Sequence, residues 1–142
     1  MAKAELNEVW DVDIEKLWNV IIRYEDYPKF VTGCTKTEVN RTADSVKVQY
    51  HVSVMSKDIL YSVDIKEDAA QKKLTWKLTE SGFFSKNEGG WELKKEGEKT
   101  RVRYSLDMEF KMYVPGFILK TLVSGSLPTM VRSFINQAKK NC

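Results

Sequence analysis

More than any other segment, residues 101–112 constrain the fold, because apolar and polar side chains alternate through the whole stretch. Side chains of a β-strand point to opposite faces with a period of two. One face therefore carries Val102, Tyr104, Leu106, Met108, Phe110 and Met112. The opposite face is mainly charged. This pattern predicts a long antiparallel strand with one buried side.

Shorter stretches with the same period of two come earlier in the chain. They cover residues 46–54, 59–66, 73–79 and 90–94, and a first strand is also expected over residues 3–10. Turn-like segments of hairpin length separate most of them, and such links are typical of an antiparallel meander. We count about seven strands in all.

Other segments have the periodicity of helices. A buried helical stripe is predicted at Ile14, Leu17, Trp18, Ile21 and Ile22. Asp13 stands where an N-cap residue is expected, and Pro28 favours a second short helix that Gly33 ends. A broad apolar stripe follows over residues 117–140. Glycine and proline at 125–128 predict a kink or a restart within this last helix.

Length and charge narrow the class of protein. A chain of 142 residues is close to the commonest domain size, so we expect one domain over residues 1–142. Charged residues make up 30% and hydrophobic residues 42%, which is typical of a folded globular protein. The net charge is only +3, and basic residues alternate with acidic ones along the expected strands. We therefore expect no DNA partner.

The ends of the chain and its cysteines bear on location. The first residues contain no apolar run like a signal peptide, and no segment is long enough to cross a membrane. We expect a cytoplasmic location without stable membrane insertion. Cys34 and Cys142 lack the spacing of a metal site, and we expect free thiols. A disulfide between them is compatible with the sequence, but nothing requires one.

Several short motifs resemble those of a known superfamily. They are Asp13-Ile14-Glu15-Lys16-Leu17-Trp18, Tyr27-Pro28-Lys29-Phe30, Gly90-Trp91-Glu92-Leu93, Thr100-Arg101-Val102-Arg103-Tyr104 and Pro115-Gly116-Phe117. With the order of the elements, they resemble the START-like (SRPBCC, Bet v 1-like) superfamily. Its members include polyketide cyclase/dehydrase and lipid-transport proteins, and coenzyme Q-binding and ribosome-associated-toxin-like proteins. Thr32 departs from the pattern, since a proline is common there.

The resemblance implies an α+β helix-grip fold. In this fold a curved seven-stranded antiparallel sheet grips a long C-terminal helix, and two short helices follow strand 1. A sheet and one helix rarely fill the space between them, so a hydrophobic cavity is expected there. Its predicted lining consists of Tyr50, Tyr61, Trp76, Trp91, Tyr104, Met108, Phe110, Met112, Leu122, Met130 and Phe134. Each of these alone also fits a filled core, but aromatic and Met-rich walls with a few hydroxyls are typical of small apolar pockets.

Evidence for catalysis is weak in the sequence. His51 is the sole histidine, and strand parity places it on the outer face. The polar groups expected at the pocket are tyrosine phenols and one of Ser124 and Ser126. One histidine and two distant thiols do not make a metal site, so we expect neither metal nor other cofactor. We assign no catalytic residue.

Three functions remain in order of preference. The first is non-catalytic binding or carriage of a hydrophobic small molecule, such as a lipid, an isoprenoid quinone or a polyketide-like aromatic. The second, implied by the resemblance, is a polyketide aromatase/cyclase. The third is a regulator that docks on the ribosome or another protein through basic residues of the outer sheet face. Those residues are Lys47, Lys73, Lys77, Arg101, Arg103 and Lys111.

Overall fold

One curved antiparallel sheet dominates the computed structural model, which describes residues 2–54 and 57–140. Its seven strands within those residues are β1 (Ala2–Trp10), β2 (Cys34–Arg41), β3 (Val46–Val54), β4 (Lys57–Asp68), β5 (Lys73–Ser81), β6 (Phe84–Glu96) and β7 (Lys99–Phe110). The spatial order is β1-β7-β6-β5-β4-β3-β2, so consecutive strands from β2 to β7 form a meander. This confirms the predicted fold class.

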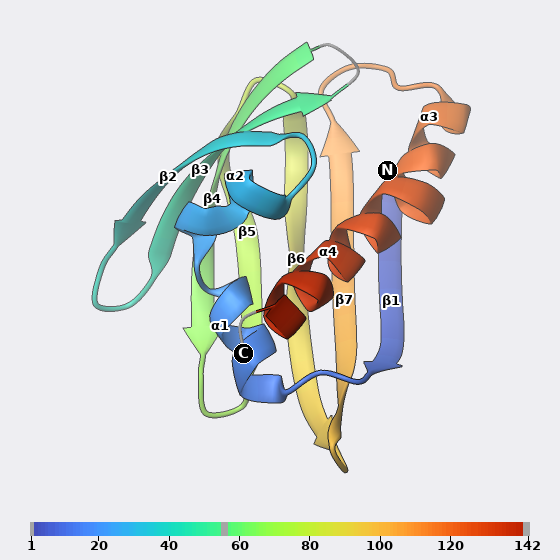
Figure 1. Ribbon diagram of the computed structural model, residues 1–142. Helices are drawn as coiled ribbons and strands as arrows, with labels where there is room; N and C mark the ends of the chain where they lie inside the picture. The colour runs from blue at the N-terminus through green and yellow to red at the C-terminus, as the bar shows by residue number, and fades with distance from the viewer. Residues whose placement is uncertain (1, 55–56, 141–142) are drawn as a thin grey trace.

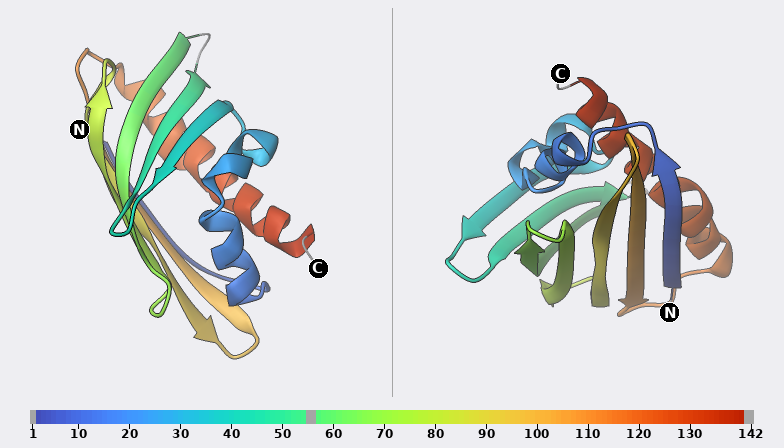
Figure 2. Two further views of the ribbon diagram at one scale, coloured as in Figure 1. Left: turned by 90° about the vertical axis from the view of Figure 1, so that its left-hand side faces the viewer. Right: turned by 90° about the horizontal axis from the view of Figure 1, so that it is seen from below.

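Helices connect the two edges of the sheet and cover its concave face (Figures 1 and 2). The link from β1 to β2 contains α1 (Ile14–Ile21), η1 (Tyr24–Asp26) and α2 (Tyr27–Phe30). After β7 come α3 (Gly116–Thr121), the π-helical turn η2 (Leu122–Ser126) and α4 (Leu127–Lys140). The π-helical turn confirms that the last helix is interrupted where glycine and proline meet.

Capping and turn residues define where the first helices begin and end. The Asp13 carboxylate accepts a hydrogen bond from the Lys16 backbone N–H at 3.1 Å, which confirms the N-cap. The second helix ends at Phe30, earlier than predicted, because Val31 is already extended. Gly33 then has a φ of +88°, a left-handed conformation that favours glycine, and it turns the chain into β2.

Two strands differ from the sequence prediction. None of the stretches proposed from the alternation covers β2, because its interior has a single aliphatic side chain, Val39, among polar residues. β-branched residues at alternate positions were the available signal. Strand β6 begins at Phe84, well before the predicted residue 90, because Asn87 and two glycines interrupt its apolar alternation.

The core lies between the concave sheet face and the helices. From α4, Val131, Phe134, Ile135 and Ala138 are buried against it. The hydroxyl of buried Thr100 on β7 donates a hydrogen bond to the Val12 carbonyl at 2.7 Å, which holds the start of the helical link against the sheet. Val9 is 39% exposed because it lies on the outer face of β1.

Candidate functional site

An apolar cavity of about 490 Å³ lies between the concave sheet face and the C-terminal helical segment. This volume is within the range of small-molecule sites. Among the described residues that line it, none is Asp, Glu, Lys, Arg or His. The wall therefore presents aromatic and aliphatic surface with a small number of neutral polar groups.

Most residues that the sequence predicted for this cavity lie at its wall. They are Tyr50, Tyr61, Trp76, Trp91, Tyr104, Met108, Phe110, Met112, Met130 and Phe134. The side chain of Leu122 lies outside the part of the chain that the structure describes. That these residues bind a ligand stays a prediction.

Met112 has a different position from the predicted one. We expected it on the inner face of the last strand, but β7 ends at Phe110, opposite Phe84, the first residue of β6. Beyond that pair, β6 provides no further strand residues. Met112 consequently lies at the mouth of the cavity and is 44% exposed.

Strand register assembles the aromatic wall. Tyr50 and Tyr61 are direct partners across β3 and β4, and their ring centroids are 5.2 Å apart. Trp91 and Tyr104 are partners across β6 and β7, with centroids 4.9 Å apart. Trp76 on β5 lies 5.7 Å from the Tyr104 ring. Ring contacts of this kind rigidify the wall.

Three phenol groups at the wall are available to a ligand. The hydroxyls of Tyr50, Tyr61 and Tyr104 have no hydrogen-bond partner within the described parts of the chain. Burial is the main cause that raises the pKa of all three phenols above the ordinary value. They are therefore protonated at neutral pH, and each has a hydrogen to donate.

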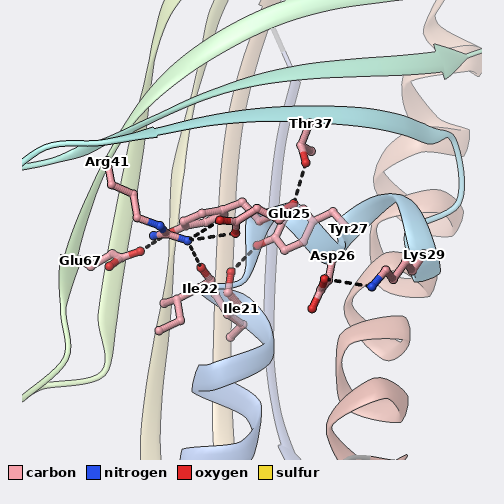
Figure 3. A network of polar contacts seen from close by, with 10 residues as sticks. Ile21, Ile22, Glu25, Asp26, Tyr27, Lys29, Thr37, Arg41 and Glu67 are labelled. Carbon is pink, nitrogen blue, oxygen red and sulfur yellow. Dashed lines mark hydrogen bonds and ion pairs between the residues drawn. The ribbon is translucent and has the colours of Figure 1, made fainter.

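Two further tyrosines line the cavity but have internal partners. The Tyr24 hydroxyl donates to the Glu67 carboxylate, and the Tyr27 hydroxyl donates to the Ile21 carbonyl (Figure 3). Neither residue was predicted to line the cavity. The available signal was their spacing of three just before Pro28, which places both on one side of a helical turn.

A polar network holds these two tyrosines in place (Figure 3). Arg41 on β2 forms an ion pair with Glu25 at 3.0 Å and donates to the Ile22 carbonyl at 3.3 Å. Thr37, also on β2, donates to the Tyr24 carbonyl at 2.9 Å. These contacts hold η1 against the edge strand β2 at this end of the cavity.

Asn87 adds a polar group that was not predicted from the sequence. It is buried on β6, and its side-chain oxygen accepts a hydrogen bond from the Trp76 indole N–H at 3.1 Å. Its amide nitrogen is then left as a further donor at the cavity wall. Strands β5 and β6 therefore place two neutral polar groups, the Trp76 indole and the Asn87 amide, side by side.

The remaining titratable groups give little scope for acid–base chemistry. The buried Cys34 thiol lines the cavity, and burial raises its pKa. His51 lies outside the cavity, with its Nε2 atom 3.3 Å from Glu38. Ser126 lines the mouth, whereas the Ser124 hydroxyl donates to the Lys120 carbonyl at 2.6 Å. Among the described residues, no cluster of three or more His, Cys, Asp or Glu side chains could hold a metal ion.

A curved sheet that holds a C-terminal helix around a ligand-sized cavity defines the helix-grip class of proteins. The family model described as polyketide cyclase/dehydrase and lipid transport matches residues 10–135. The chain belongs to this family, within the START-like superfamily. A comparison with curated proteins gives no match.

Solved structures share this fold. A START superfamily protein from Mycobacterium smegmatis is 17% identical, with a TM-score of 0.86 and 100% coverage of both chains. An 18 kDa protein from Caulobacter crescentus is 20% identical, with a TM-score of 0.82 and coverage of 99% and 97%. An aromatase/cyclase from Streptomyces sp. R1128 is 13% identical, with a TM-score of 0.77 and coverage of 96% and 90%. Identities this low establish the fold alone.

Proposed function

We propose that this protein binds and carries an uncharged hydrophobic molecule that bears hydrogen-bond acceptors, such as carbonyl oxygens. The observation that carries the proposal is the cavity of about 490 Å³, whose described lining includes no charged side chain and three unpartnered phenols. Lipids, isoprenoid quinones and polyketide-like aromatics all have this chemistry. We place this activity in the cytoplasm, where a free thiol such as Cys34 is stable.

Charge is the first criterion for the ligand. An ion that enters an apolar cavity loses its hydration and needs a counter-charge or several hydrogen bonds. No side chain at the described wall offers a counter-charge. A neutral ligand has no such cost, and burial of its apolar surface contributes roughly 25 cal/mol per Å² before the costs of association.

Hydrogen bonding is the second criterion. The phenols of Tyr50, Tyr61 and Tyr104 and the amide nitrogen of Asn87 all present donors, and their protons stay in place at neutral pH. A ligand that is rich in acceptors satisfies these donors. A ligand that presents only donors leaves these buried protein donors without acceptors, which costs about 1–3 kcal/mol for each.

The cyclase alternative needs a group that exchanges a proton with its substrate. The buried titratable groups at the described wall include the Tyr50, Tyr61 and Tyr104 phenols and the Cys34 thiol, and burial raises the pKa of each. They donate hydrogen bonds but are poor proton acceptors at neutral pH. Carriage without catalysis therefore has the better support.

The docking alternative relies on a basic outer sheet face. Arg101 pairs with Glu96 at 2.8 Å, and Arg103 pairs with Glu5 at 2.9 Å. These ion pairs neutralise part of the positive charge that an RNA or acidic partner would meet. The observations favour a small-molecule ligand over this partner.

The direct test is mass spectrometry of the freshly purified protein under native and denaturing conditions, with organic extraction of any released compound. We expect a co-purifying neutral, hydrophobic molecule. The purified protein should also bind Nile red, which is neutral and carries a carbonyl. We expect its affinity for Nile red to be about tenfold higher than its affinity for the anionic probe ANS. An empty protein that binds neither probe would contradict the proposal.

Substitution of single tyrosines separates ligand-binding from structural hydroxyls. For Tyr50→Phe, Tyr61→Phe and Tyr104→Phe, we expect at least one to weaken Nile red binding about three- to tenfold, because one hydrogen bond is lost. None should lower the free energy of unfolding, since these hydroxyls have no internal partner among the described residues.

Tyr27→Phe is the matched control. It should lower the free energy of unfolding by about 1–2 kcal/mol, because the buried Ile21 carbonyl loses its donor, with little change in affinity. Urea unfolding and fluorescence titration measure the two effects. If all four variants lose stability to the same extent and none loses affinity, the cavity hydroxyls are structural.

A further inference from the structure

The mouth of the cavity carries an exposed apolar segment, residues 112–120, which we call the mouth segment. Met112, Tyr113 and Phe117 are 44%, 87% and 73% exposed. The segment joins β7 to the C-terminal helices at one end of the molecule, and α3 lies at the periphery (Figures 1 and 2). Side chains of this size are seldom so exposed next to one another without a binding role.

Helix α3 contributes apolar surface without burying any residue. Phe117, Ile118 and Leu119 follow one another in it, and none is buried. The rings of Tyr113 and Phe117 make no aromatic contact with another ring in the described chain. Met112, Tyr113 and Ile118 also line the cavity, so this surface is continuous with the mouth.

Along the chain, the mouth segment and the residues that follow it carry charge of one sign. From Phe110 to the end of the chain there are five basic residues and no Asp or Glu. Lys111 and Lys120, at the two ends of the segment, are both exposed. The preceding acidic residue, Glu109, alternates with Met108 and Phe110 on β7 and therefore lies on the outer sheet face.

We propose that the mouth segment docks this protein on an anionic lipid bilayer. Aromatic side chains partition to the membrane interface, and flanking lysines are attracted to anionic headgroups. Among the described residues no helix is long and apolar enough to span a bilayer, so the contact is peripheral. A protein partner would need a larger complementary patch than this short segment supplies.

Docking in this orientation places the mouth of the cavity against the lipid. The inference goes beyond the proposed function, and it does not require the cavity to be filled. Phe117 is the side chain to test, because it does not line the cavity and its replacement leaves the wall intact.

The test is co-sedimentation of the purified protein with vesicles of phosphatidylcholine alone or mixed with 30% phosphatidylglycerol. We expect binding to the anionic vesicles that weakens with salt.

Phe117→Ser should weaken this vesicle binding about tenfold, because a side chain of this size contributes that much on insertion. Lys120→Gln should weaken it about fivefold, since each lysine near an anionic surface contributes on this scale. Val9→Ser, an exposed apolar residue on the outer face of β1, is the matched control and should bind like the unchanged protein.

The outcomes separate this inference from the proposed function. If the unchanged protein does not bind anionic vesicles, or Phe117→Ser binds as well as Val9→Ser, the docking surface is wrong even when Nile red still binds. If Phe117→Ser instead abolishes self-association in analytical ultracentrifugation, the segment contacts a second copy of the chain and the lipid proposal is overturned. Vesicle binding without Nile red binding supports docking and contradicts carriage.

Discussion

Phe134→Ala is expected to lower the free energy of unfolding by about 3–5 kcal/mol, the usual cost for a buried phenylalanine. Phe134 is 2% exposed on α4. Its ring centroid lies 5.0 Å from Tyr27, 5.1 Å from Phe30 and 5.0 Å from Trp91. One side chain therefore joins α4 to the short helices and to the sheet, and its loss enlarges the cavity that it lines.

The matched control for this prediction is Phe117→Ala, which removes the same atoms from an exposed position. We expect its effect on stability to be within about 0.5 kcal/mol, since surface substitutions seldom change it more. Urea unfolding followed by tryptophan fluorescence measures both variants. A loss below about 1 kcal/mol for Phe134→Ala would mean that α4 is not seated on the sheet as described.

Gly89→Ala is expected to cost at least about 3 kcal/mol, the upper range for an overpacked core. A Cβ atom at Gly89 would lie 2.0 Å from the Ser105 carbonyl oxygen and 2.9 Å from the Trp76 ring. The carbonyl belongs to the backbone of β7, so the strand itself must shift. Trp76 and Tyr104 face the cavity at this place, and we expect weaker Nile red binding as well.

Gly82→Ala is the control for the glycine prediction. A Cβ atom at Gly82 meets nothing within 4 Å, and its φ is not in the left-handed region. We expect no loss of stability and a gain of up to about 1 kcal/mol, because alanine restricts the unfolded chain. Equal effects of the two substitutions would show that β5, β6 and β7 do not approach as closely as described.

Local patterns in the sequence predicted the elements that depend on neighbouring residues. The alternation over 101–112 located β7, Asp13 located the start of α1, and the glycine and proline near 125–128 located the break in the last helix. Side-chain parity also indicated which residues face inward. These features were predictable because strand period, capping and backbone restriction act over a few residues.

Local patterns were insufficient where pairing with another strand decides the outcome. Strand β2 has little apolar signal, and its pairing with β3 defines it. The end of β7 depends on where β6 begins, which left Met112 at the mouth of the cavity.

The sequence by itself determined the order of the elements, the inward face of the strands and the neutral, aromatic character of that face. Only the tertiary structure decided that a cavity of about 490 Å³ remains there, and which phenols keep free hydroxyls. Tyr27 and Tyr104 are the same residue type, yet the first donates to the Ile21 carbonyl and the second has no partner among the described residues. The physical reason is that periodicity specifies the direction of a side chain, whereas volume and hydrogen-bond partners depend on how closely distant elements pack.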